Sequence, residues 1–340
     1  MKRVIIVAVF LFGLCVLDRG IGAIMQSGFS KIRSGELGGQ INEALEQRDS
    51  KIIVFGSSLA KYHVAPTVIT EISGDSCFNA GCNGQDIYYA KLLQSLLLQD
   101  EIETKTFIYI LNWSDLYRAD IERAKVFAPF VDDSQDVREL LCRSGTWESL
   151  KYQSHAYRYN SIGVSIVRHL LKPESKGDAG FFGMETDYIE NPDDTAEMKR
   201  AANIESLDQL IDTKLLAHKL RLYDEFVLAA KRADIATVLV IPPTYREGGY
   251  PMGAKERLAR FHFTQLAERH SIELINLDET NVDEFQNVEY FGDQRHLNAR
   301  GAEIFSSKLA AQLKTLKTAT AILQPSSPIE PMLTNISDRN

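Results

Sequence analysis

The chain has 340 residues, of which 44% are hydrophobic and 25% charged, a composition typical of a globular protein rather than a disordered or fibrous one. Its formal net charge of −8, with no run of Lys and Arg, argues against a dedicated nucleic-acid-binding protein, which would carry a basic face. Cys15 lies near the amino terminus, and the remaining cysteines, Cys77, Cys82 and Cys142, are odd in number and predict neither a disulfide framework nor a metal site.

An apolar segment follows the first three residues. Val4 to Leu17 is fourteen residues without a charge, which as a helix is about 21 Å long against a hydrocarbon core of about 30 Å. Asp18-Arg19 interrupts the run, and a helix through Met25 spans a slightly thinned bilayer if these charges reach the interface. We expect residues 1–28 to be an uncleaved signal anchor or, alternatively, a cleaved signal peptide. A buried amino-terminal element is the remaining alternative.

Short apolar runs rich in β-branched residues alternate with amphipathic stretches along the rest of the chain. Runs that are apolar throughout are typical of parallel strands buried on both faces, and the alternation with helices predicts a doubly wound, three-layer α/β/α sandwich. The predicted strands are Lys51–Phe55, Ser76–Ala80, Thr106–Leu111, Thr237–Ile241 and Glu273–Leu277. The predicted helices are Gly35–Gln47, Asp86–Gln99, Ile204–Arg232, Lys255–His270 and Ala299–Leu316.

Two regions fall outside this alternation. An insert at about 113–203 separates the third and fourth strands, with predicted helical pieces at Val137–Leu141 and Ile162–Leu171. Such an insert either shapes access to a site or is a solvated elaboration. The tail, 318–340, carries Pro and Ser without periodicity and predicts disorder, so that the α/β domain covers 29–317.

Polar residues follow the strands at the edge where an open α/β sheet binds its ligands. The first strand is followed by Gly56-Ser57-Ser58, the second by the glycine-containing stretch Asn79–Asp86 and the third by Leu111–Asp115. Asp293 and His296 come after the last strand, just before the final helix. Each of these features alone is weak evidence of a functional site. Their occurrence at the ends of several strands of one sheet is what predicts such a site.

Together these residues contain the parts of a serine hydrolase. A serine hydroxyl becomes a nucleophile when a nearby histidine takes its proton and a carboxylate holds that histidine. Asp293 and His296, three residues apart in a turn, can present both groups on one side. Gly84 can direct a backbone N–H at a developing oxyanion. A dinucleotide site is not predicted, because G-x-G-x-x-G is absent, and His63 reads as a residue of the loop or helix after the first strand.

The motifs resemble those of the SGNH (GDSL-type) hydrolases. The Gly-Asp-Ser block is matched by Gly56-Ser57-Ser58, with Ser58 as nucleophile and Ser57 in place of the aspartate, as is common in the membrane-anchored, polysaccharide-modifying branches. The second block resembles Asn79–Gly84, with Gly84 at the oxyanion-hole glycine. The last block, the most specific match, is formed by Asp293, His296, Leu297, Asn298 and Gly301.

The third block departs from the family pattern Gly-x-Asn-Asp. In "LNWSD" Ser114 stands where the family has the oxyanion-binding Asn, and Asn112 comes two residues earlier. Either residue can donate to the oxyanion, or the third donor is absent. The resemblance covers about 52–115 and 235–316 and leaves the insert unexplained.

The resemblance implies a five-stranded, flavodoxin-like sheet and a Ser58–His296–Asp293 triad that needs no metal or organic cofactor. The implied activity is that of an extracytoplasmic serine esterase or O-acyltransferase acting on acylated carbohydrate, with a multi-spanning O-acyltransferase as a candidate partner. The implied location is the bacterial inner membrane, with the body outside the cytoplasm, or the periplasm after cleavage of the signal. The alternative is a catalytically degenerate domain that binds glycan or scaffolds a polysaccharide-modifying assembly.

Overall fold

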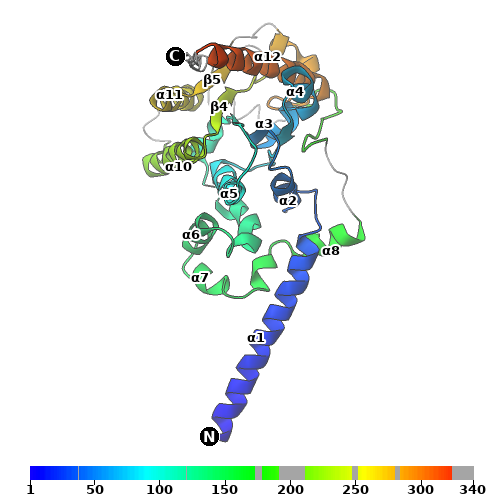
Figure 1. The fold of residues 1–340 in the computed structure, drawn as a ribbon, viewed down its shortest axis with the longest axis vertical. Helices are drawn as coiled ribbons and strands as arrows, with labels where there is room; N and C mark the ends of the chain where they lie inside the picture. The colour runs from blue at the N-terminus through cyan, green and yellow to red at the C-terminus, as the bar shows by residue number, and fades with distance from the viewer. Residues whose placement is uncertain are drawn as a thin grey trace, which may run out of the picture.

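The computed structural model describes residues 1–36, 38–119, 121–172, 178–190, 211–246, 252–279 and 284–323 (Figure 1). Its centre is a sheet of five parallel strands in the order β2-β1-β3-β4-β5. Each strand lies within one residue of its predicted bounds, because apolar β-branched runs buried on both faces are a strong local signal. The strands are β1 (Ile52–Gly56), β2 (Cys77–Asn79), β3 (Thr106–Ile110), β4 (Ala236–Ile241) and β5 (Glu273–Asn276).

Helices cover both faces of the sheet. Alternate strand residues point to opposite sides, so that Phe55 and Tyr109 join one buried apolar cluster while Val54 and Ile108 join the other. The first cluster is covered by α2 (Gly39–Glu46), α5 (Ile87–Leu97), α10 (Thr213–Arg232) and α11 (Ala254–His270). The second is covered by α3 (Ser58–His63), α4 (Pro66–Ser73) and α12 (Ala299–Leu323). The predicted three-layer α/β/α sandwich is therefore confirmed.

Several helix ends differ from the predicted ones. Helix α2 begins at Gly39 and not at Gly35, because Gly35 and Gly38 have φ angles of 88° and 105°, which an α-helix does not accept. Helix α10 begins at Thr213, where the Asp212 carboxylate accepts N–H groups of the first turn. The part of that predicted helix before residue 211 lies outside the described residues.

The last helix runs further than the sequence predicted. Helix α12 continues to Leu323, past Thr318, because no Pro or Gly interrupts it before Pro325. Residues 318–323, the start of the predicted tail, are thus helical, and the rest of the tail, 324–340, lies outside the described residues.

The described part of the insert is mostly helical up to residue 171, whereas residues 178–190 contain only an isolated bridge between Asp178 and Phe181. Its predicted piece Val137–Leu141 falls within α6, and the piece Ile162–Leu171 matches α8 except that Ile162 is the N-cap. Figure 1 shows α6, α7 and α8 at the end of the body from which the amino-terminal helix emerges. The elements of the insert are η1 (Trp113–Tyr117), η2 (Ile121–Phe130), α6 (Gln135–Arg143), α7 (Glu148–Lys151), η3 (Tyr157–Tyr159) and α8 (Gly163–Leu171).

The amino-terminal segment forms one long helix, α1 (Lys2–Phe29), which projects from the body (Figure 1). Its most apolar window of eighteen residues has a mean hydropathy of 2.4, and none of that window is buried. The helix is longer than the predicted one, which ended at Met25, and its length and composition are compatible with a signal anchor or a signal peptide.

Candidate active site

Ser58 lies at the carboxyl end of β1, as the first residue of α3. The strand ends at Gly56 with a φ of 146°, and a Cβ at this position would lie 2.8 Å from the carbonyl oxygen of Ile110. The turn therefore requires glycine. Ser57 follows as the N-cap, and its hydroxyl accepts the N–H of Leu59. The two adjacent serines thus have different local roles: Ser57 starts the helix and Ser58 projects into the pocket.

The structure brings Ser58, His296 and Asp293 together across 235 or more residues of chain. Ser58 Oγ lies 2.7 Å from His296 Nε2, and His296 Nδ1 lies 2.8 Å from Asp293 Oδ2. Asp293 Oδ1 also accepts the backbone N–H groups of Arg295 and His296, each at 2.8 Å. Because Asp293 accepts the Nδ1 proton, Nε2 is left to accept the proton of the serine hydroxyl.

The charge state of Asp293 follows from its contacts. Burial opposes ionisation of the carboxyl, but the hydrogen bond and charge of His296, with the N–H groups of Arg295 and His296, outweigh it. The pKa of Asp293 is therefore lowered, and the carboxylate stays charged at neutral pH to hold the imidazole.

Local packing fixes the turn that carries Asp293 and His296. Phe291 and Leu297 form an isolated antiparallel bridge, and both side chains are buried. The Asn298 side chain accepts the N–H of Gly301 at 3.0 Å and so begins α12. A Cβ at Gly301 would lie 2.1 Å from the carbonyl oxygen of Tyr290, so the close approach of this helix to the turn requires glycine.

His63 was predicted to lie in the loop or helix after the first strand, and the structure places it in that helix. It ends α3, is fully buried, and packs behind His296 with ring centroids 6.4 Å apart. Its Nε2 lies 3.1 Å from the backbone oxygen of Arg295 and 3.1 Å from the backbone nitrogen of Leu297, on either side of His296. Burial and the charge of His296 lower the pKa of His63 to about 3, so this ring is neutral. The one sequence feature that indicated a position near His296 is that His63 lies five residues after Ser58.

Gly84 lines the same pocket as Ser58 and His296, a cavity of about 180 Å³. It has a φ of 65°, and a Cβ there would lie 1.3 Å from Arg123 Nη1, because the insert reaches over this loop. The loop ends at Asp86, which caps α5 through Tyr88 N–H and forms a buried ion pair with Lys219. Gly84 is therefore held on a fixed backbone beside the serine.

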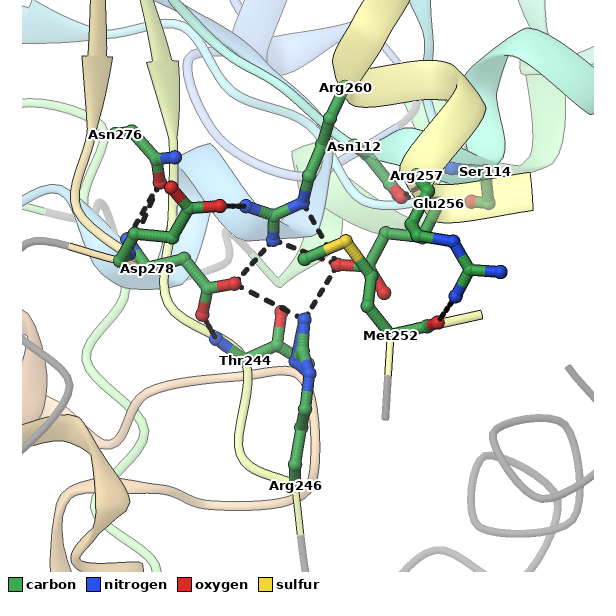
Figure 2. Close-up of polar contacts among 11 residues, drawn as sticks. Asn112, Ser114, Thr244, Arg246, Met252, Glu256, Arg257, Arg260, Asn276 and Asp278 are labelled. Carbon is green, nitrogen blue, oxygen red and sulfur yellow. Dashed lines mark hydrogen bonds and ion pairs between the residues drawn. The ribbon is translucent and has the colours of Figure 1, made fainter. Parts of the chain in front are cut away.

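Asn112 and Ser114, the two candidates for a third oxyanion donor, are bonded to each other (Figure 2). The Ser114 backbone N–H and hydroxyl donate to Asn112 Oδ1 at 3.1 and 2.9 Å. Two donors at that oxygen direct the Asn112 amide N–H₂ group away from Ser114. Asn112 lines the pocket of Ser58, whereas Ser114 is buried and has used its hydroxyl proton. Asn112 is thus the better placed of the two.

A second cavity, of about 60 Å³, adjoins this pocket and shares Leu59, Asn112 and Arg295 with it. It lies between the ends of β3 and β4 and the first turns of α11. Its walls are mostly apolar, and ionised side chains stand at one end. The apolar walls are Leu59, Leu111, Trp113, Ile241, Pro242 and Phe263.

The ionised end of this second cavity is a network of two arginines and two carboxylates (Figure 2). Glu256 Oε1 accepts from Arg246 Nη2 at 2.7 Å and from Arg260 Nη2 at 2.8 Å, and Asp278 contacts both arginines from behind. Because each charge in the network has a partner of opposite sign, it forms a fixed wall rather than a surplus of either charge.

No family model matches the chain, and no curated protein matches it. Among solved structures, the chain is similar to one titled an acetyl xylan esterase, with 12% sequence identity, 77% of this chain and 99% of that chain covered, and a TM-score of 0.39. A likeness at this level shows neither the activity nor the substrate of the chain.

Proposed function

We propose that the protein is an SGNH-type serine enzyme that transfers acyl groups at ester bonds of acylated carbohydrate. The observation that supports this most directly is the 2.7 Å contact between Ser58 Oγ and His296 Nε2, backed by Asp293. Ser58 meets the Asp293–His296 pair, distant from it in sequence, in the geometry that activates a serine hydroxyl.

In the proposed reaction Ser58 Oγ attacks the ester carbonyl while His296 Nε2 takes the hydroxyl proton. Asp293 stabilises the imidazolium that forms. The tetrahedral intermediate collapses when His296 gives its proton to the leaving alkoxide, and the acyl group stays on Ser58. Water or a sugar hydroxyl then attacks this acyl-enzyme with His296 as base, which gives hydrolysis or transfer respectively.

The backbone N–H groups of Ser58 and Gly84 and the side-chain amide of Asn112 are the proposed donors to the oxyanion. Asn112 takes the place that the family pattern gives to a later Asn, and its orientation is set by the two hydrogen bonds from Ser114. Ser114 thereby acts on the reaction only through Asn112.

The two adjoining cavities suggest which part of the substrate each one binds. The pocket of Ser58 is lined by polar side chains, among them Gln85, Asp115 and Arg118, which suit the hydroxyls of a sugar. The second cavity is mostly apolar and, at about 60 Å³, suits a short acyl chain closed off by the Glu256 network. We therefore expect short acyl esters to be better substrates than long ones.

The proposed location is the outer side of a bacterial inner membrane, with α1 as anchor, and a multi-spanning O-acyltransferase is the proposed partner. A secreted form after cleavage of α1 is the alternative. A non-catalytic, glycan-binding domain remains the rival from another class, and the changed third block is the feature that favours it.

A fluorophosphonate probe tests the proposal on the folded full-length chain. We expect covalent labelling of Ser58, its loss in Ser58→Ala and His296→Ala, and retention in the control Ser307→Ala, whose serine lies on α12. Folded protein that is not labelled would favour the non-catalytic rival. Product analysis with an acylated glycan and a sugar acceptor then separates the two reactions, because release of free acid indicates an esterase and acyl gain by the acceptor a transferase.

A further inference from the structure

Exposed apolar side chains outside α1 gather in one short part of the insert. Among the described residues, nine large apolar side chains outside α1 are exposed, and six of them lie between residues 147 and 171. Val164 and Leu171, on α8, are 85% and 82% exposed. The other three, Ile189, Leu228 and Phe261, lie apart on other segments. The six are Trp147, Leu150, Val164, Val167, Leu170 and Leu171, which we call the apolar patch.

The same part of the insert holds the end of α1. Asp18 accepts the backbone N–H groups of His155 at 2.9 Å and Ala156 at 3.1 Å, together with the hydroxyl of Ser154. A Cβ at Gly22 would lie 2.4 Å from His155 Cβ, so that α1 and the insert approach closely. At Gly28 a Cβ would lie 2.7 Å from Ile166 Cγ2 of α8. The insert is therefore fixed against α1 and keeps the apolar patch beside it.

These contacts affect how much of the length of α1 can lie in a bilayer. The charge of Asp18 interrupts the apolar run in the sequence, but its carboxylate accepts hydrogen bonds from residues 154–156 of the insert. Arg19, the next residue, contacts His155, and beyond it Ile21 and Ile24 are 38% and 71% exposed. The uncharged run Val4–Leu17 is about 21 Å long, so that α1 spans a slightly thinned bilayer when Asp18, Arg19 and residues 154–156 lie at its interface. On this register the carboxyl-terminal turns of α1, and the insert beside them, lie at the membrane surface.

Helix α8 has the pattern of a helix that lies flat in such a surface. Ile166 faces the body and is buried, whereas Val164, Val167 and Leu171 face outward, and Arg168 and Lys172 flank them. An outward apolar face with basic neighbours suits the boundary between lipid headgroups and acyl chains. Trp147 is a residue type enriched at that depth.

The arrangement in space agrees with a lipid surface. Figure 1 shows α7 and α8 on opposite sides of α1, at the end of the body from which α1 emerges. A bilayer crossed by α1 can therefore contact the apolar residues at α7 and those on α8 at the same time. Between α1 and α8 lies an open groove of about 740 Å³, lined by Ile21, Met25 and the outward residues of α8, which lipid chains can fill.

We propose that the apolar patch of the insert docks into the same bilayer that α1 crosses, at the depth of the headgroup and acyl-chain boundary. The docking depends on α1 being embedded and is independent of the chemistry at Ser58. It gives the insert a role, which is to fix the height and orientation of the body over the membrane.

Tryptophan fluorescence tests this depth in the full-length chain reconstituted in nanodiscs. Trp113 and Trp147 are the two tryptophans of the chain, so Trp113→Phe leaves Trp147 as the only reporter. Phospholipids brominated near the headgroup should lower the Trp147 emission by about half, and aqueous acrylamide should quench it weakly. The matched control, Trp147→Phe, leaves Trp113 beside the active-site pocket, where brominated lipid should have no effect.

A pair of charge variants sharpens the test. Val164→Asp with Leu171→Asp should reduce bromolipid quenching of Trp147 several-fold. Ile189→Asp with Phe261→Asp, on other segments and 67% and 57% exposed, should leave it unchanged. Both pairs alter exposed side chains, and circular dichroism verifies that each variant is folded.

Two results would overturn the docking. Strong quenching of Trp147 by acrylamide and none by brominated lipid would place the patch in water. Protection of Trp147 from both quenchers would place it against a protein, either a second copy of the chain or another partner. Co-elution of the chain with the nanodiscs in these cases would show that α1 is embedded, so that the failure would belong to the docking and not to the anchor.

Discussion

The two ends of this molecule use opposite arrangements of polar and apolar groups. At the carboxyl edge of the sheet, polar side chains are held by one another and by the backbone: Asp293 by two N–H groups, His296 by Asp293, and Asn112 by Ser114. At the end where α1 emerges, large apolar side chains such as Val164 and Leu171 are exposed and have no protein partner among the described residues.

The two ends differ because chemistry at an ester and association with a membrane place different demands on structure. Chemistry on an ester needs a few atoms fixed to within a fraction of an ångström, which strands and helix ends provide. Association with a membrane needs apolar area and suitable flanking charges, which a short amphipathic helix provides without exact geometry. Substitutions at the first end should therefore act on turnover, and those at the second on membrane depth.

The largest effect is expected for His296→Ala. Ser58 then has no base, and turnover of p-nitrophenyl acetate should fall by about 10⁴-fold, as on loss of a triad member. Steady-state kinetics measures the change, with His262→Ala on α11 as the control that keeps activity. Activity within tenfold of the unmodified protein would remove the triad from the proposed mechanism.

Asn112→Ala should lower kcat by about 10²- to 10³-fold with little change in KM, since an oxyanion donor acts in the transition state. Ser114→Ala keeps the Asn112 amide but frees its orientation, so a smaller loss is expected there. If Ser114→Ala lowers kcat more than Asn112→Ala does, the third oxyanion donor is Ser114, and its proposed role in orienting Asn112 is wrong.

His63 should make stability depend on pH. Its pKa in the folded protein, about 3, lies below the ordinary histidine pKa of 6.5, so the unfolded chain binds more protons between these values. Stability should fall as pH drops below about 6.5, by at most about 1.4 kcal/mol per pH unit from this group. Urea unfolding at several pH values measures the slope, which His63→Gln should flatten. An equal slope in both proteins would mean that His63 is not the group responsible.

The smallest effect is expected for Val164→Asp with Leu171→Asp in the apolar patch. Turnover of the soluble ester p-nitrophenyl acetate in detergent should stay within about twofold, because exposed side chains away from the site change little of the folded state. A large fall in kcat would contradict the separation of the two ends and would show that the insert acts on the active site.

The strands and the site motifs could be predicted from the sequence because they are local signals. A run such as Ile52–Phe55, apolar at every position, indicates a buried strand by itself, and Gly56-Ser57-Ser58 gains meaning from its place after that strand. The Asp293–His296 spacing likewise sets both groups within one turn. Helix ends were less well predicted, because Asp212 and the glycines near α2 act through backbone geometry that composition does not reveal.

Other features depend on contacts between distant segments. The sequence alone determined the layered fold, the order of the polar strand ends and the apolar start of the chain, since each follows from neighbouring residues. Only the tertiary structure decided that Asn112 rather than Ser114 faces the pocket, that His63 is buried behind His296, and that Asp18 is satisfied by residues 154–156. Each of these depends on hydrogen bonds and packing whose partners no local pattern of residues specifies.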